Sequence, residues 1–244
     1  MSGHSKWHNI QGKKGKADKA RSNLFTKAAR AITVAVQQGG SDPDMNFVLR
    51  IAIDKAKTAN MPKENIERAI KRGTGELSDG VALQEVLFEG FGPAGTAIMV
   101  EAVTDNNNRT VSDIKHVFGR FNCSLGGPGS VRWQFQRLGV ARLGKNQNEK
   151  IKMKNSEFEL ELMDAGASDL VDSEIGLEIQ CPAENLRKMM GVIKKYYLEP
   201  ESSGLEWVAK EPVELSELDS VKVQEFCELL DELEDVREVY TNEM

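Results

Sequence analysis

Apolar residues recur at helical spacing along the first third of the chain. Over residues 17–38, one face at about 100° per residue carries Phe25, Ala28, Ala29, Ile32 and Val36. Gly39-Gly40 is a typical helix end, and Asp42-Pro43 is expected to start a second helix as N-cap and first helical residue. A third helix is predicted over residues 62–73. The short loops between the helices predict a compact three-helix bundle.

After the third helix the spacing becomes strand-like. Residues 83–90 and 96–104 are rich in β-branched and aromatic residues around a glycine-rich turn, which predicts two strands. The polar loop 105–110 leads into a helix, and the glycine-rich residues 126–129 turn into a further strand at 130–136. The predicted order is therefore β, β, α, β.

The region between residues 138 and 210 repeats a related order. We expect a strand at 139–143, a helix at 156–165, and strands at 169–172 and 177–180. A helix that begins at Cys181-Pro182 and a strand at 205–209 follow, so the order is β, α, β, β, α, β. This order is the split βαβ arrangement of ferredoxin-like domains. An acidic amphipathic helix and a final strand at 236–240 follow, and they would complete the segment at 83–136.

These elements predict an α+β fold, with an N-terminal three-helix bundle plus two ferredoxin-like α/β domains, the second inserted in the first. The expected domains are 1–79 for a basic arm and the bundle, 80–136 with 211–244 for a discontinuous domain, and 137–210 for the inserted domain. A chain of 244 residues is long enough to bury such cores.

Composition narrows the class of protein. The sequence has no apolar run near the roughly 18 residues that span a bilayer, and no apolar segment follows its basic start as in a signal peptide. The three cysteines, Cys123, Cys181 and Cys227, are far apart and form no CxxC pair, so reduced core cysteines are expected. We therefore expect a cytoplasmic protein that does not contact a membrane.

Charge is unevenly distributed along the chain. Residues 1–80 hold 15 Lys or Arg and 8 Asp or Glu, a net of +7, whereas the whole chain has a net charge of −6 and the remainder therefore −13. Clustered bases gain affinity for phosphates by displacing counterions, so this distribution predicts a polyanionic partner for the N-terminal region.

The candidate nucleic-acid-binding residues lie in a glycine-rich arm and on the first helix. They are Lys6, Trp7, Lys13, Lys14, Lys16, Lys19, Arg21, Lys27 and Arg30. Four of the bases fall within an arc of roughly 80° opposite the apolar face. An ordinary solvated helix face is the alternative interpretation of this stripe. Trp7 would either stack on an exposed base or pack against the bundle.

Arg109 is a further candidate, because it lies where a helix is expected to begin. The helix dipole disfavours a cation at that end, and a bound anion would compensate. The neighbouring Asn, Asp and Thr side chains are also suited to simple helix capping. Both interpretations of the loop at 105–110 remain open at this stage.

Motifs for catalysis or for cofactors are not convincing. The GxGxxG match at residues 90–95 is followed by strand-like residues rather than a helix, which favours a glycine-rich hairpin over a dinucleotide site. The sequence contains no Walker A, HExxH or GxSxG motif, and the pair His4 and His8 lacks further metal ligands. We expect no enzyme activity, no cofactor, no metal and no small-molecule substrate.

The sequence resembles the YebC family, which includes the mitochondrial translational activator of cytochrome oxidase subunit one. The resemblance rests on Gly3-His4-Ser5-Lys6-Trp7, Ile10, Lys13, Asp18, Arg21, Phe25, Lys27, Thr104-Asp105-Asn106, Asn108-Arg109-Thr110, Gly129-Ser130-Val131, Asp235-Val236 and Val239-Tyr240. It implies the same three domains and a cytoplasmic, non-enzymatic protein. Members resemble either DNA-binding transcriptional regulators or ribosome-associated factors that assist translation, including through proline-rich stretches.

The first hypothesis is therefore a nucleic-acid-binding regulator of gene expression, described as a DNA-binding transcriptional regulator of the YebC type. The alternative is a ribosome-associated translation factor that contacts ribosomal RNA and relieves stalling at proline-rich stretches. The sequence shows no helix-turn-helix recognition helix with evident base readers, which keeps this alternative open. A protein–protein adaptor is the third hypothesis. The oligomeric state is not predicted.

Overall fold

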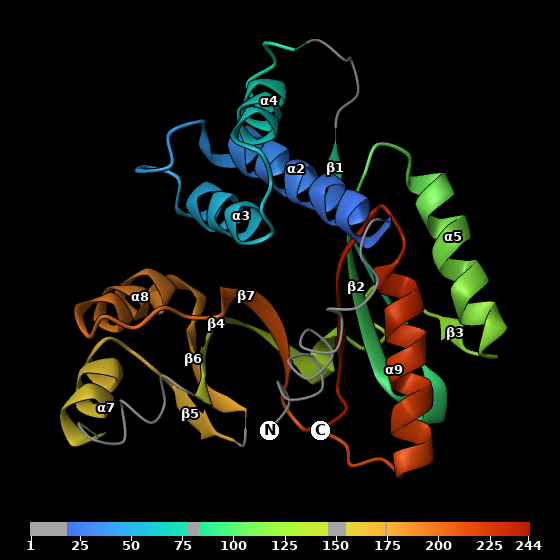
Figure 1. Ribbon diagram of the computed structural model, residues 1–244. Coiled ribbons are helices and arrows are strands. Elements are labelled where there is room, and N and C mark those ends of the chain that lie inside the picture. The colour runs from blue at the N-terminus through green and yellow to red at the C-terminus, as the bar shows by residue number, and fades with distance from the viewer. Residues whose placement is uncertain (1–18, 78–82, 146–154, 174) are drawn as a thin grey trace. The chain divides into compact units, whose positions relative to one another are not determined.

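The computed structural model describes residues 19–77, 83–145, 155–173 and 175–244, with the backbone alone at 19–22 and 155–156. These residues form two compact units (Figure 1). The smaller unit is Gln136–Val208, and the larger unit combines the described residues up to Phe135 with Ala209–Met244. The architecture is mixed helix and sheet, as the sequence predicts, with helices alone in the N-terminal part.

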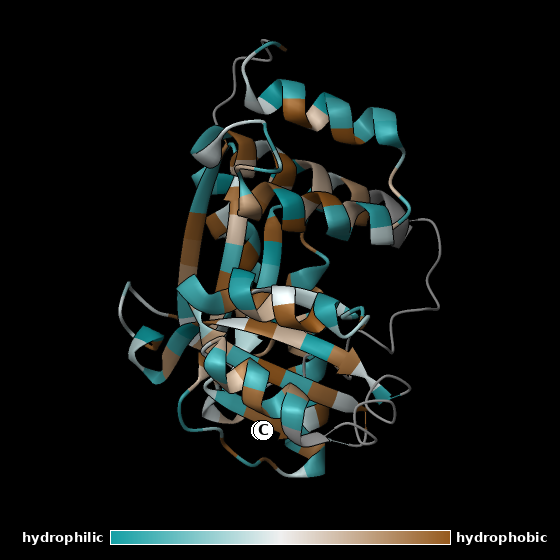
Figure 2. Cartoon of the chain, turned by 90° about the vertical axis from the view of Figure 1, so that its left-hand side faces the viewer, coloured by the Kyte–Doolittle hydropathy of each residue, from teal (hydrophilic) through white to brown (hydrophobic). Residues whose placement is uncertain are grey.

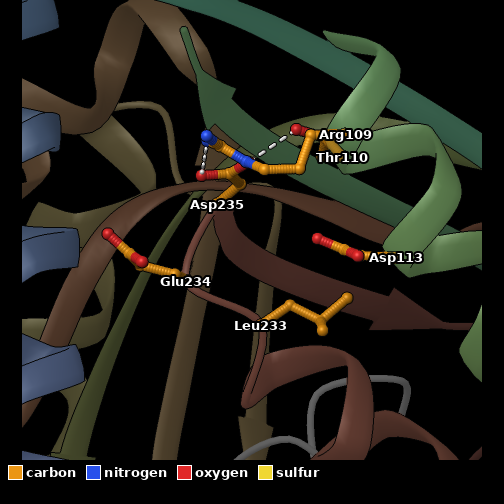
Figure 3. A pocket seen from close by; sticks show the side chains of 6 residues that line it. All are labelled: Arg109, Thr110, Asp113, Leu233, Glu234 and Asp235. Atoms are coloured by element: carbon orange, nitrogen blue, oxygen red, sulfur yellow. Dashed lines mark hydrogen bonds and ion pairs between the residues drawn. The ribbon is translucent and has the colours of Figure 1, made fainter. Parts of the chain in front are cut away.

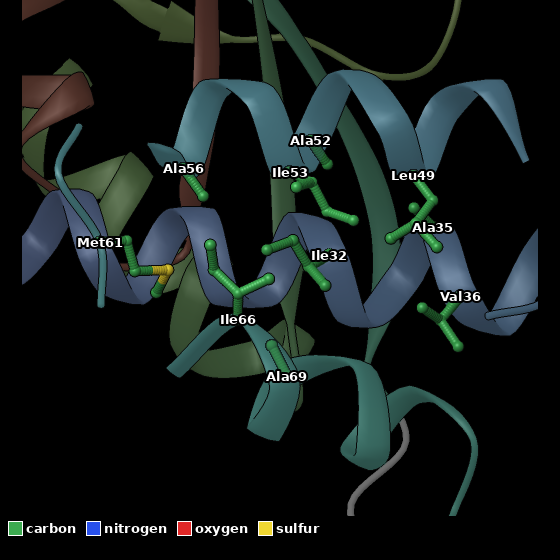
Figure 4. Packing of buried hydrophobic residues seen from close by; sticks show 10 residues of the cluster. All are labelled: Ile32, Ala35, Val36, Leu49, Ala52, Ile53, Ala56, Met61, Ile66 and Ala69. Carbon is green, nitrogen blue, oxygen red and sulfur yellow. The ribbon is translucent and has the colours of Figure 1, made fainter. Parts of the chain in front are cut away.

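The N-terminal part of the larger unit is a bundle of the three helices predicted from the apolar spacing. They are α2 (Lys19–Gly39), α3 (Phe47–Thr58) and α4 (Lys63–Gly73). Ten buried residues form its core (Figure 4): Ile32, Ala35, Val36, Leu49, Ala52, Ile53, Ala56, Met61, Ile66 and Ala69. Each helix combines hydrophobic and hydrophilic residues (Figure 2), because only one side of each faces this core.

The second helix begins later than the sequence predicts. Its N-cap is Asn46 rather than Asp42, and the Asn46 side chain accepts a hydrogen bond from the backbone amide of Leu49 at 3.0 Å. The same side chain is buried, and its amide donates to the carbonyls of Ala35 and Gly40 at 2.7 and 2.8 Å. Asn46 therefore caps two helix ends at once, a tertiary contact that spacing alone does not reveal.

Replacing Asn46 with alanine should lower the free energy of unfolding by about 2–3 kcal/mol, because a cap is lost and buried backbone groups become unsatisfied. Urea unfolding followed by circular dichroism measures the change. Asn46→Ser is the matched control, since the serine hydroxyl keeps a cap acceptor and the two donated bonds are lost without a buried charge. Equal losses in the two variants would contradict a role for the cap itself.

A four-stranded sheet forms the rest of the larger unit. Its strands are β1 (Gln84–Phe91), β2 (Ala97–Thr104), β3 (Ser124–Leu125) and β8 (Val236–Thr241), in the order β3-β1-β2-β8. β1 and β2 pair as an antiparallel hairpin across the short turn η1 (Pro93–Gly95). The GxGxxG match is therefore a hairpin, as predicted. Positive φ angles at Ala94 and Gly95 make the turn.

Two helices cover one face of this sheet (Figure 1): α5 (Asn107–Arg120) and α9 (Glu217–Asp231). Phe118 of α5 and Phe121, its C-cap, pack edge to face on Phe226 of α9, with ring centroids 4.9 and 5.3 Å from that of Phe226. β8 pairs antiparallel with β2, so the C-terminal helix and strand belong to the same sheet as the hairpin. β2, α5 and β3 form a split βαβ unit with β1 between the strands.

The prediction of a strand at residues 130–136 is wrong for residues 130–134, and only Phe135 and Gln136 are in a strand, at the start of the strand that continues to Gly144. That segment contains the short helix η2 (Arg132–Gln134). The buried carboxylate of Glu89 accepts the backbone amides of Gly129, Val131 and Arg132 at 2.7, 3.0 and 2.8 Å. Burial opposes ionisation of Glu89, but these bonds outweigh it and hold the pKa of Glu89 below its ordinary value. A side chain thus binds the amides that a strand would have paired.

The smaller unit has the predicted ferredoxin-like order. Its elements are β4 (Phe135–Gly144), α7 (Asn155–Asp164), β5 (Asp169–Asp172), β6 (Gly176–Pro182), η3 (Ala183–Asn185), α8 (Leu186–Lys195) and β7 (Ser202–Ala209). The strands lie in the order β5-β6-β4-β7, and β6 is antiparallel to both β4 and β5. The first and second strands of the unit are therefore separated by the third, which defines the split βαβ arrangement.

Candidate nucleic-acid interface

The structure describes only part of the predicted basic surface. Five of the predicted residues lie outside the described residues: Lys6, Trp7, Lys13, Lys14 and Lys16. Lys19 and Arg21 belong to the start of α2, where the backbone alone is described. Lys27, Arg30 and Arg109 have described side chains, and all three make ion pairs within the larger unit. Nucleic-acid binding by the predicted residues therefore stays a prediction.

Lys27 contacts the C-terminal end of α9. Its ammonium group donates to the carboxylate of Asp231 at 3.2 Å and also to the Asp231 carbonyl. Only 14% of the Lys27 side chain is exposed. Beside it, the Asn23 side chain donates to the Glu232 carbonyl at 3.2 Å. A cation at a helix C-terminus is favoured by the helix dipole, so this contact stabilises α9 as well as binding α2 to it.

Arg30 makes the densest set of contacts. Its guanidinium donates to the carboxylate of Asp235, to the carboxylate of Glu234 at 2.9 Å, and to two backbone carbonyls. We call residues 231–235 the acidic segment, because four of its five residues are Asp or Glu. The middle of α2 therefore lies with two of its bases against the acidic segment.

Arg109 lies in the first turn of α5, as predicted, with Asn106 as the N-cap. Its guanidinium binds Asp105 at 2.7 Å. It also binds Asp235 at 3.0 Å (Figure 3). The hydrogen bond and charge of Asp235, followed by those of Asp105, raise the pKa of Arg109. The anion that compensates for a cation at this helix end is thus supplied by the chain itself, while 46% of the Arg109 side chain stays exposed.

Asp235 is the centre of this network, and the residue-by-residue reading of the sequence did not select it as a site residue. Its Oδ2 accepts hydrogen bonds from the hydroxyls of Thr104 and Thr110 at 3.1 and 2.6 Å and from the Arg109 guanidinium at 3.0 Å, whereas its Oδ1 accepts from Arg30. Only 6% of its side chain is exposed. Burial favours the neutral acid, but the donors outweigh it and hold the pKa of Asp235 below its ordinary value. The carboxylate therefore joins α2, β2, α5 and β8.

Part of the basic stripe of the first helix is therefore already paired within the chain. Lys27 and Arg30 are neither a fully solvated face nor an open phosphate-binding face, because the acidic segment already supplies their anions. The sequence feature that indicates the acidic segment is the acidic composition between α9 and β8, which ends with Asp235 directly before the last strand. The missing information was which basic face this segment would meet.

The described residues form neither a metal-binding cluster nor a membrane-spanning helix. Among the side chains that the structure describes, no group of three or more His, Cys, Asp or Glu is arranged to hold a metal ion. Of the helices in the described ranges, none is both long and apolar enough to cross a bilayer.

These features define a class of α+β protein, in which one unit joins a helical bundle to a four-stranded sheet through the Asp235 network and a second unit is ferredoxin-like. A family model for the TACO1/YebC protein N-terminal domain matches residues 5–76, and one for the TACO1/YebC second and third domain matches residues 83–243. The chain belongs to the TACO1/YebC family.

Relatives match over nearly the full length. A protein of Syntrophomonas wolfei named "Probable transcriptional regulatory protein" is 41% identical, over 99% of this chain and 96% of its own. One of the same name from Persephonella marina is 44% identical, over 99% and 95%. The crystal structure of a conserved hypothetical protein from Aquifex aeolicus is 38% identical, with a TM-score of 0.81 over 95% of this chain and 93% of the other.

Proposed function

We propose that this chain is a nucleic-acid-binding regulator of gene expression, with DNA as the first candidate target. The observation that carries the proposal is the net charge of +7 on residues 1–80 of a chain whose total is −6. The name "Probable transcriptional regulatory protein" of its relatives supports it. The proposal includes a non-catalytic role, no small-molecule substrate and a cytoplasmic location.

The contacts of α2 restrict where the phosphates would bind. Lys27 and Arg30 already have anionic partners, so releasing them would cost the energy of those ion pairs. The proposed phosphate contacts are therefore the bases nearer the N-terminus, with Trp7 available to stack on an unpaired base. These bases are Lys6, Lys13, Lys14, Lys16, Lys19 and Arg21.

A second candidate is a ribosome-associated translation factor that contacts ribosomal RNA and relieves stalling at proline-rich stretches. The packing of α2 favours this candidate. A helix that reads DNA bases must enter a major groove about 12 Å wide. α2 instead packs against α3 and α4 on one side and contacts the acidic segment on another. Recognition of phosphates and shape, as in RNA binding, requires no such free helix.

Changing Lys13, Lys14 and Lys16 to glutamate should weaken binding to a 20-base-pair duplex at least about 100-fold at low salt, because three phosphate contacts become repulsive. The plot of log affinity against log salt should flatten by about 3, at roughly 0.9 per phosphate contact. Fluorescence anisotropy over a salt series measures both quantities.

The matched control changes Lys57, Lys63 and Arg68 to glutamate, three exposed bases of the bundle. The total charge change is the same, so this control separates a local contact from a general effect of net charge. If both triple variants lose the same affinity and slope, the N-terminal bases are not the binding site.

Crosslinking in cells, followed by sequencing of the bound nucleic acid, distinguishes the candidate targets. Enrichment of promoter DNA supports the transcriptional regulator, and enrichment of ribosomal RNA supports the translation factor. Recovery of neither contradicts both and leaves the protein–protein adaptor.

A further inference from the structure

Helix α8 of the smaller unit has a strongly basic exposed face. At about 100° per residue, its four bases fall within an arc of about 120°, opposite the buried residues Leu186, Met189 and Ile193. Gly191 lies near the middle of this arc and is exposed. The basic face of α8 consists of Arg187, Lys188, Lys194 and Lys195, all exposed.

This charge is unusual in its context. Residues 186–197 carry four bases and no acid. They lie within residues 81–244, which together have a net charge of −13. Lys195 binds Glu161 of α7 at 2.6 Å. Within the described ranges, no ion pair is found for Arg187, Lys188 or Lys194. Three of the four bases are therefore available to an external anion.

Tyr197 follows the helix in a conformation that suits glycine better than tyrosine. Its φ angle is +58°, in the left-handed region, and its amide donates to the Lys194 carbonyl at 3.0 Å. The next amide, of Leu198, donates to the Ile193 carbonyl at 3.2 Å and completes the helix end. Glycine is the usual residue at this position, because a side chain there is disfavoured by sterics.

Packing does not explain this tyrosine, because 96% of its surface is exposed. Its neighbour Tyr196 differs in every respect. The Tyr196 ring packs edge to face on Phe158 at 4.9 Å, and its hydroxyl donates to Glu161 at 3.1 Å. One tyrosine thus anchors the helix end, while the next one presents a ring to solvent at a cost in backbone conformation. Such a strained position points to a binding role.

We propose that the basic face of α8 and Tyr197 form a second nucleic-acid contact, whose ligand is an unpaired strand. This proposal rests on the proposed function and names its ligand class. The pairs Arg187–Lys188 and Lys194–Lys195 are about 10 Å apart along the helix axis, so they can bind separate phosphates of one backbone. Gly191 between them leaves room for close approach. The Tyr197 ring stacks on a base, which is accessible only when the base is unpaired.

The test uses the full chain and a fluorescein-labelled 12-nucleotide oligo(U), which has no secondary structure. Tyr197→Gly should weaken oligo(U) binding about tenfold, whereas Tyr197→Phe keeps the ring and should bind as the parent does. The melting temperature of Tyr197→Gly should be unchanged or higher, because glycine removes the backbone strain. A purely structural tyrosine would not give weaker binding together with equal or greater stability.

Charge is tested by changing Arg187, Lys188 and Lys194 to glutamate, which should weaken oligo(U) binding and reduce its salt slope by about 2, at roughly 0.7 per single-strand contact. All variants are measured with Lys13, Lys14 and Lys16 intact and changed to glutamate. If changing Lys13, Lys14 and Lys16 to glutamate leaves the affinity for oligo(U) unaltered, the proposed N-terminal site fails. If Tyr197→Gly does not weaken oligo(U) binding, whether Lys13, Lys14 and Lys16 are intact or changed, the α8 contact fails.

Three results would overturn the α8 contact. The first is Tyr197→Gly binding oligo(U) as tightly as the parent. The second is that Tyr197→Gly loses as much affinity for a 12-base-pair duplex, whose bases are already stacked, as it loses for oligo(U). The third is competition by a 12-residue polyglutamate peptide as effective as that of unlabelled oligo(U), which would assign the basic face to an acidic protein.

Discussion

Replacing Arg142 with methionine should lower the free energy of unfolding of the smaller unit by about 3–5 kcal/mol, the typical cost of breaking a buried ion pair. Arg142 lies on β4, and only 1% of it is exposed. Its guanidinium binds Glu178 at 2.7 Å and Glu206 through two bonds at 2.8 and 2.9 Å. Methionine fills a similar space without the charge, so two buried carboxylates would lose their cation.

The geometry explains why the effect should be large. Glu178 is directly opposite Arg142 on β6, and Glu206 lies on β7, so one cation joins the three strands β6, β4 and β7. Burial acts against the charged arginine, but the two carboxylates outweigh it and raise the pKa of Arg142. Because typical domains are stable by only about 5–15 kcal/mol, the variant should be close to unfolding at neutral pH.

Urea unfolding with circular dichroism, together with hydrogen exchange of the β4 amides, measures this loss. The control is the triple variant Arg142→Met, Glu178→Leu and Glu206→Leu. It should recover most of the stability, because replacing a whole buried charge cluster by apolar residues is often neutral or stabilising. If the single variant loses less than about 1 kcal/mol, solvent must reach the two carboxylates.

The Arg142 cluster also shows what a local pattern can and cannot predict. The sequence predicts a strand at residues 139–143, and the order of the elements predicts the ferredoxin-like arrangement. An arginine inside a strand, however, reads as a position on the exposed face. Its partners are 36 and 64 residues away in sequence. Only the strand order places them beside it.

The same reason separates the predicted and observed roles of α2. Apolar spacing predicts the helix and its buried face, because both depend on residues a few positions apart. The partner of Arg30 is 205 residues away. No property of the helix indicates that an acidic segment will meet its opposite face. The wrong start of α3 and the wrong strand after residue 129 have a related cause, since Asn46 and Glu89 satisfy distant backbone groups.

Replacing Asp235 with asparagine should cost roughly 3 kcal/mol at neutral pH, at the lower end of the range for a broken buried ion pair because Arg109 remains half exposed. Asparagine has nearly the same shape, but it leaves Arg30 and Arg109 without their shared carboxylate. It also places an amide donor among the hydroxyls of Thr104 and Thr110. The expected loss is therefore electrostatic rather than a loss of packing.

The dependence on pH identifies this cause. The pKa of Asp235 is lower in the folded protein than its ordinary value of about 3.9. Its contribution is therefore fully present above that ordinary value and is lost as pH falls through the lowered folded value. Urea unfolding of parent and Asp235→Asn from pH 7 down to pH 3 and below should show a difference that is constant near neutrality and shrinks below about pH 4.

Asp113 provides the matched control, because it is an exposed carboxylate that lines the same pocket as Asp235 (Figure 3). Asp113→Asn makes the same chemical change on α5, one helical turn after Arg109, and should leave stability nearly unaltered. If the cost of Asp235→Asn persists undiminished in acid, the loss comes from altered hydrogen bonding of the amide. The network would then stabilise the junction of α2, β2, α5 and β8 by shape rather than by charge.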